Sequence, residues 1–120
     1  MSPPEPARYE IKFIDYTAAQ ARALDGSIKK PFKNLSWKKL AVNPQGYGTE
    51  LHAPLTGYWK HEFRTHRVIY RIYAELLLVV VCAIGPRKQG DVADVYAQLA
   101  PLIKAGKIAE QLSAILKLKR

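Results

Sequence analysis

Polar and apolar residues alternate along two neighbouring segments, 58–65 and 66–74, and a third segment, 76–84, is apolar almost throughout. Alternation is typical of a strand with one face in water, whereas a continuously apolar strand is covered on both faces. The third segment stops at Gly85 and Pro86, which do not favour a continuing strand. The pattern therefore predicts two consecutive hairpins, with the apolar segment at the centre of the sheet.

The first hairpin is predicted to turn at Thr65 and His66. This register pairs Arg64 with Arg67, Glu62 with Ile69 and Lys60 with Arg71, and directly opposed side chains share a face. One face then carries Lys60, Glu62, Arg64, Arg67 and Arg71. The other face carries Trp59, His61, Phe63, Val68, Tyr70 and Ile72. A slip of one residue would bury the arginines, which is too costly, so the sequence predicts a wet cationic face and an aromatic core face.

The rest of the chain predicts a further strand over residues 8–15, helices over about 16–24 and 27–42, and a loop over 47–54. A helix from about Asp91 to Ala100 follows, Pro101 should kink or restart it, and an amphipathic segment ends the chain. We expect an α+β fold: a small, twisted, mainly antiparallel four-stranded sheet with an N-terminal helical hairpin and a C-terminal helix. The helices should cover one sheet face, and the first strand should pair with the apolar strand.

The predicted organisation is a disordered tail over residues 1–8, one domain over 9–104 and a helical extension over 105–120. The chain of 120 residues has 19 Lys and Arg against 10 Asp and Glu, a formal charge of +9. This excess favours an anionic partner, such as nucleic acid, an acidic protein or a membrane surface, although some soluble proteins are simply basic. No apolar run is long enough to span a bilayer and the first residues lack a signal-peptide core, so we expect a cytoplasmic protein without a membrane partner.

Most known catalytic and metal-binding patterns are missing from the sequence. It contains no phosphate-binding glycine loop, no H-E-x-x-H and no G-x-S-x-G. The three histidines lack the spacing of metal ligands, and Cys82 is the only cysteine, so a disulfide or multi-cysteine zinc site is excluded and a small buried residue is expected. The sequence predicts neither a metal nor a cofactor.

The predicted cationic face could bind a phosphate backbone, because arginine forks match phosphate oxygens. Arg64 and Arg71 would add contacts to nucleic acid, as would Lys88 beyond the strands. Cleavage of RNA without a metal needs a base for the 2′-hydroxyl proton, and Glu62 or Lys60 could serve. A solvated strand face with Glu62 balancing its neighbours explains the same residues.

Arg87 follows the apolar strand and Tyr96 lies on the next helix. Tyr96 could stack on a base, donate a proton or simply pack in the core.

The sequence resembles the RelE/ParE superfamily of bacterial toxin–antitoxin toxins from about Tyr9 to Tyr96. The resemblance rests on residues 55–59 (LTGYW), 66–72 (HRVIYRI) and the apolar strand, followed by 85–87 (GPR) and 94–96 (DVY). It implies a metal-free endoribonuclease that cuts mRNA in the ribosomal A site and leaves a 2′,3′-cyclic phosphate. It also implies that Arg67 and Arg87 contact the scissile phosphate, that Lys60 acts in catalysis and that Tyr96 stacks on or activates the substrate.

The resemblance has two departures. Glu62 occupies the position of a second catalytic lysine found in some members, while others use a glutamate near this chain's Glu50. The loop between Arg87 and Tyr96 is longer than usual.

The implied partners are a cognate antitoxin and mRNA on the ribosome. Two alternatives stay open: a ParE-like inhibitor of DNA gyrase, and an inactive protein of the same fold that only binds.

Overall fold

The computed structural model describes residues 8–53, 55–86 and 95–119, and its core is a five-stranded sheet in the order β1-β5-β4-β3-β2. The strands are β1 (Glu10–Phe13), β2 (Thr49–Glu50), β3 (Trp59–Phe63), β4 (His66–Tyr73) and β5 (Leu78–Pro86). β1 pairs with β5 in parallel, and the other pairs are antiparallel. The predicted α+β class and the place of β1 beside the apolar strand are confirmed.

Two details of the predicted sheet are wrong. A fifth strand, β2, lies where a loop was expected, and the middle position belongs to β4 rather than to the apolar strand β5. β2 was missed because a two-residue strand among Gly and Pro carries no readable alternation. β5 nevertheless has neighbours on both sides, and Leu78 to Ile84 are all buried, as its continuous apolar pattern predicts.

The N-terminal helices cover one face of the sheet. They are α1 (Asp15–Arg22), α2 (Gly26–Pro31), the π-helical turn Phe32–Ser36 and α3 (Trp37–Val42), the last three forming one continuous segment. Phe32 and Leu40 from this segment pack against Val68, Tyr70 and Val81 of the sheet. The expected aromatic core face is therefore present.

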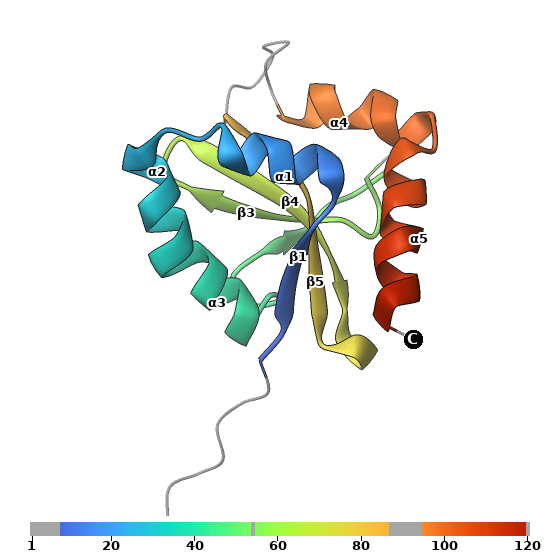
Figure 1. Ribbon diagram of the computed structural model, residues 1–120, viewed down its shortest axis with the longest axis horizontal. Coiled ribbons are helices and arrows are strands. Elements are labelled where there is room, and N and C mark those ends of the chain that lie inside the picture. The colour runs from blue at the N-terminus through green and yellow to red at the C-terminus, as the bar shows by residue number, and fades with distance from the viewer. Residues whose placement is uncertain (1–7, 54, 87–94, 120) are drawn as a thin grey trace, which may run out of the picture.

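The C-terminal helices α4 (Val95–Lys104) and α5 (Lys107–Lys119) pack on the opposite face, so the sheet lies between two helical layers (Figure 1). Leu99 of α4 and Leu112 of α5 join Ile69, Val80 and Cys82 in a second core. The prediction that helices cover one face only is wrong. A strand that is apolar on both sides requires cover on both sides, and the amphipathic end of the chain provides it.

α4 includes Pro101 and continues to Lys104, so the helix does not restart at this residue, and the predicted kink stays a prediction. The residues 91–94 that were assigned to the start of this helix lie outside the described residues. The break after Lys104 occurs at Gly106, whose φ of 77° lies in the left-handed region that glycine adopts without steric cost. This turn lets α5 run back along the sheet, where the Gln111 side chain accepts a hydrogen bond from the Tyr16 backbone N–H at 3.2 Å.

Candidate functional site

The first hairpin turns at Arg64 and Thr65, one residue earlier than predicted at each position. Glu62 therefore pairs with Arg67, and Lys60 pairs with Ile69. This shift moves the partner of each residue by two, so the assignment of residues to faces is unchanged, but the predicted pairs Arg64–Arg67, Glu62–Ile69 and Lys60–Arg71 are wrong. The turn places Arg64 at a φ of 55°, a conformation that costs energy for any residue with a Cβ.

The register brings Lys60, Glu62 and Arg67 together on the face beneath α4. The Arg67 Nη2 atom donates a hydrogen bond to Oε1 of Glu62 at 3.0 Å, and Nζ of Lys60 lies 3.4 Å from the same oxygen. Tyr96, in the first turn of α4, places its ring 4.4 Å from the Arg67 guanidinium carbon, in cation–π distance. We call Lys60, Glu62, Arg67 and Tyr96 the ionic cluster.

The ionic cluster is more enclosed than the sequence predicted. Arg67 is only 4% exposed, whereas the side chains of Lys60 and Glu62 are each about one-third exposed at 30% and 31%. The expected wet cationic face is wrong at Arg67, because the start of α4 covers it. A buried guanidinium is costly unless it is paired, and Glu62 supplies the pairing carboxylate.

Gly85 explains how α4 comes so close to the ionic cluster. It pairs with Arg67 across β4 and β5, and a Cβ on this residue would lie 3.1 Å from Cβ of Val95. That separation is tighter than ordinary packing allows, so any larger residue would push the start of α4 away. Reasoning from the sequence did not identify this role, although a glycine directly opposite a candidate arginine was a readable signal.

Arg71 lies apart from the ionic cluster, in a site that the sequence did not predict. Its guanidinium carbon lies 4.8 Å from the ring of Tyr58 and 6.0 Å from that of Tyr73. Burial raises the pKa of both tyrosines, and the nearby Arg71 charge partly opposes the shift. Arg71 therefore lies in a partly buried aromatic site close to α5, and its contact with nucleic acid stays a prediction.

Other candidates fall away from the ionic cluster or outside the described residues. Arg64 is exposed at the hairpin turn, with its guanidinium 5.1 Å from the ring of Phe63. Glu50 pairs with Trp59 and so shares the aromatic face, turned away from Lys60 and Glu62. Arg87 and Lys88 belong to residues 87–94, which lie outside the described residues.

Two histidines have structural contacts on the aromatic face. His61 is buried, with Nδ1 2.8 Å from the Tyr47 carbonyl oxygen and Nε2 3.1 Å from Oγ of Ser36, which joins β3 to the π-helical turn. His66 lies beside Phe32 at 6.0 Å between ring centroids, and burial lowers its pKa. Within the described ranges, no three His, Cys, Asp or Glu side chains lie close enough to hold a metal ion.

The sheet order and the two flanking helical layers define an α+β protein with the fold of RelE. The structure has a TM-score of 0.63 with a chain of the RelBE2 toxin–antitoxin complex of Mycobacterium tuberculosis, at 23% identity over 68% of this chain and 93% of that one. It has a TM-score of 0.57 with the isolated RelE toxin of Escherichia coli, at 18% identity over 79% and 98%. The predicted RelE-like fold is confirmed.

The sequence itself is similar to a putative RelE-like toxin protein of Escherichia coli. The two are 27% identical over 93 residues, which cover 76% of this chain and 96% of that protein. No protein-family model matches the chain. The resemblance to RelE-like toxins predicted from the motifs is thus confirmed by both sequence and fold. In the described part of the chain, none of the helices combines the length and the apolar character needed to cross a bilayer.

Proposed function

We propose that this protein is the toxin of a toxin–antitoxin pair and cleaves mRNA on the ribosome without a metal ion. The observation that carries the proposal is the convergence of Lys60, Glu62, Arg67 and Tyr96 at one end of the sheet. The similarity to a RelE-like toxin protein supports the toxin class. Complexes of similar structures with antitoxins support a cognate antitoxin as the partner.

In the proposed reaction, Glu62 or Lys60 removes the proton of the 2′-hydroxyl, whose oxygen attacks the adjacent phosphorus. The 5′-oxygen of the next nucleotide leaves and takes a proton, which gives a 2′,3′-cyclic phosphate and a 5′-hydroxyl. Arg67 stabilises the extra negative charge of the pentacoordinate phosphorus, the type of contribution that is often the largest in catalysis. Arg87 would act beside it, and Tyr96 would stack on a base.

Tyr96 and Glu62 enclose Arg67, so the substrate has to displace one of these contacts. A phosphate oxygen can replace the Glu62 carboxylate at Nη2 of Arg67, because both groups carry anionic oxygens that accept hydrogen bonds from the arginine fork. The release of Glu62 from Arg67 would also leave its carboxylate ready to accept a proton. We propose that substrate entry exchanges the Arg67–Glu62 ion pair for an Arg67–phosphate pair.

A second candidate function is supported by the 4% exposure of Arg67. A guanidinium that stays enclosed would serve stability, and the protein would act by binding, as a ParE-like inhibitor of DNA gyrase or as an inactive member of the fold. Purified protein added to programmed 70S ribosomes, with primer extension on the mRNA, separates the two. Cuts at the A site support the nuclease, whereas no cuts, together with gyrase-dependent DNA breaks in a separate assay, would establish the inhibitor of gyrase.

A further inference from the structure

The last helix, α5, has one face on the sheet and a second face in the solvent. Its inner face packs on the sheet through Ile108 and Leu112, which are 1% and 7% exposed. Its outer face follows the three- and four-residue spacing of a helix and consists of exposed residues: Lys107, Ala109, Glu110, Ser113, Ala114, Lys117 and Leu118. The motifs that resemble RelE-like toxins end at Tyr96, so this outer face lies beyond them.

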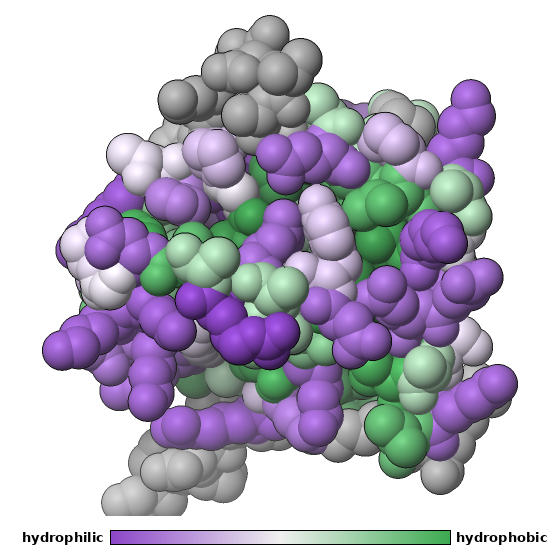
Figure 2. Space-filling model, turned by 45° about the horizontal axis from the view of Figure 1, so that its top comes forward, coloured by the Kyte–Doolittle hydropathy of each residue, from purple (hydrophilic) through white to green (hydrophobic). Residues whose placement is uncertain are grey.

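The outer face of α5 is more apolar than the surface of the N-terminal helical layer. Leu118 is 86% exposed, more than any other large apolar residue in the described part of the chain. The α2–α3 segment instead exposes a series of lysines: Lys29, Lys30, Lys33, Lys38 and Lys39. Figure 2 shows the difference, with hydrophilic side chains over α2 and α3 on the left and apolar side chains at the surface on the right, where α4 and α5 lie.

A groove of about 300 Å³ runs beside this outer face, between α5 and the point where β1 leads into α1. Its lining is mainly apolar and consists of Phe13, Ile14, Asp15, Glu110, Gln111, Ala114, Ile115 and Leu118. The hydrogen bond from the Tyr16 backbone N–H to Gln111 ties the two sides of the groove together at 3.2 Å. A single exposed leucine is ordinary, but an exposed leucine beside an apolar groove indicates a contact surface.

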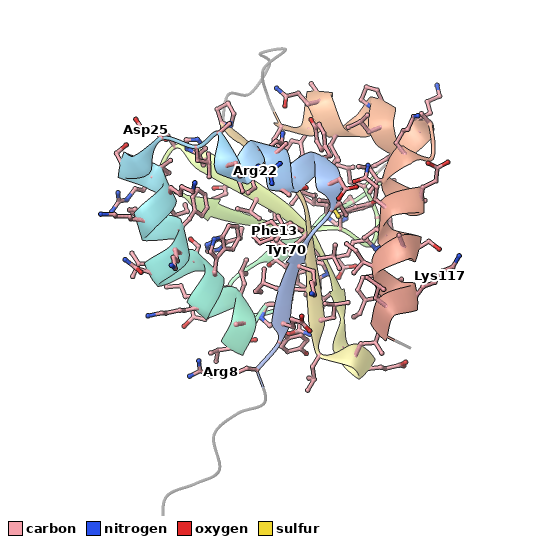
Figure 3. The ribbon with its side chains drawn as sticks, viewed as in Figure 1. Arg8, Phe13, Arg22, Asp25, Tyr70 and Lys117 are labelled. Atoms are coloured by element: carbon pink, nitrogen blue, oxygen red, sulfur yellow. The ribbon has the colours of Figure 1, made fainter. Side chains whose placement is uncertain are left out.

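The groove is acidic although the chain as a whole has a charge of +9. Asp15 and Glu110 are the charged residues of its lining, and within the described residues neither takes part in an ion pair. An occupant should therefore bring a basic group next to an apolar one. α5 carries this combination itself as Lys117 and Leu118, and Figure 3 shows Lys117 projecting outward from the helix.

We propose that two copies of this chain form a dimer through α5, with the two helices antiparallel and Leu118 of each copy in the groove of the other. A two-fold axis near Ala114 pairs residues that lie at equal distances on either side of it. Leu118 of one protomer then comes beside the partner's Glu110 and the partner's Gln111, and Lys117 comes within reach of the same glutamate. The small side chains of Ser113 and Ala114 at the crossing allow the helices to approach closely.

The charges of this surface favour pairing between identical copies. Lys107 and Lys117 balance Asp15 and Glu110, so the surface is locally neutral and two basic chains can approach there with less repulsion than elsewhere. Because α5 has 13 residues and is about 20 Å long, the interface is at the low end of the size range of specific complexes. We therefore expect a reversible dimer with a dissociation constant of about 1–100 µM.

Sedimentation equilibrium of the full chain tests the dimer without RNA or antitoxin, so its result is independent of the proposed nuclease. Over a range of about 1–300 µM, the average mass should rise from 13.5 kDa towards twice that value. Leu118→Glu should raise the dissociation constant by about tenfold or more, because it places a charge in the partner's apolar groove. Leu35→Glu is the matched control, because Leu35 is 45% exposed on the opposite helical layer and the charge change is the same.

A charge swap tests the antiparallel arrangement. Glu110→Lys and Lys117→Glu should each weaken the dimer by about threefold to tenfold, because like charges would then face each other across the axis. The double variant restores opposite charges and should bring the dissociation constant back to within about twofold of the unmodified value. Within one chain the two residues are two helical turns and about 10.5 Å apart, so restoration cannot come from a contact inside the monomer.

Circular dichroism would confirm that every variant is folded before its mass is measured. A monomer at all concentrations would overturn the proposal, because the surface would then take a different protein or remain in solvent. A dimer that Leu118→Glu leaves intact, or that Leu35→Glu weakens equally, would place the interface elsewhere and overturn it too. Failure of the double charge variant to restore a dimer that both single variants weaken would contradict the antiparallel pairing of α5.

Discussion

Removal of the Glu62 charge should destabilise the protein although the residue lies near the surface. Glu62→Gln keeps the shape of the side chain but leaves the Arg67 guanidinium, 4% exposed, without its carboxylate at 3.0 Å. Breaking a fully buried ion pair costs about 3–5 kcal/mol, and exposed pairs are worth about 0.2–1 kcal/mol. Because the Glu62 side chain is 31% exposed, solvent screens part of the interaction, and we expect a loss of about 2 kcal/mol.

The measurement is urea unfolding followed by circular dichroism, with free energies of unfolding obtained by linear extrapolation. Lys60→Met is the matched control, because Lys60 contacts the same carboxylate oxygen at 3.4 Å while 30% exposed, and it should cost less than about 1 kcal/mol. The double variant Glu62→Gln/Arg67→Met should be more stable than the two single losses predict, by about 1–2 kcal/mol.

A loss below about 0.5 kcal/mol for Glu62→Gln, the range typical of surface substitutions, would refute the reasoning. It would mean that solvent or other groups form the hydrogen bonds of the Arg67 guanidinium, and that the ion pair does not stabilise the ionic cluster. Additive effects in the double variant would lead to the same conclusion, because residues that share an interaction do not act independently.

Three further predictions concern stability and reactivity. Gly48→Ala should lower the free energy of unfolding by about 1–3 kcal/mol, because the new Cβ would overlap the Tyr70 hydroxyl, which donates a hydrogen bond to the Pro44 carbonyl at 2.8 Å. Gly26→Ala is the control, because no atom lies within 4 Å of the position of its Cβ, and it should not destabilise the protein. Leu77→Gly should stabilise the protein by about 1 kcal/mol, because Leu77 has a φ of 48° and is 41% exposed, whereas Leu76→Gly should not. Burial raises the pKa of Cys82 to about 12, so its thiol should not react with a thiol reagent at pH 8 until the protein unfolds. The free energy of unfolding should fall as the pH rises above 9, because the thiol then ionises in the unfolded chain but not in the folded protein. Rapid reaction of the folded protein with the reagent would contradict the burial.

The residue pattern predicted which side chains share a face better than it predicted which faces are wet. A period of two fixed the placement of Lys60, Glu62 and Arg67 on one face, and a turn displaced by one residue left that parity intact. The exact position of the turn could not be predicted from the sequence, because Arg64 adopts a left-handed conformation that arginine rarely adopts.

The helical layer formed by α4 and α5 was not predicted, but it could have been inferred from the sequence. Val80 and Cys82 of the apolar strand lie on the same face as Arg67, and a continuously apolar strand needs a covering layer there. Val95, Leu99 and Leu112 of the C-terminal segment form apolar stripes that need a surface to pack on. The enclosure of Arg67 by Tyr96 could not be predicted, because it depends on how closely α4 approaches at Gly85.

The central claim is that Arg67 serves the cleavage of RNA, and single-turnover cleavage on programmed ribosomes tests it most directly. The rate would be compared for the unmodified chain, Arg67→Ala and Arg64→Ala, at a temperature where circular dichroism shows all three proteins folded. The account predicts a loss of about 10²–10³-fold for Arg67→Ala, the usual effect of removing a group that stabilises developing charge, and a loss below about tenfold for the exposed Arg64. Cleavage by Arg67→Ala at the unmodified rate, or no cleavage by the unmodified chain, would contradict it.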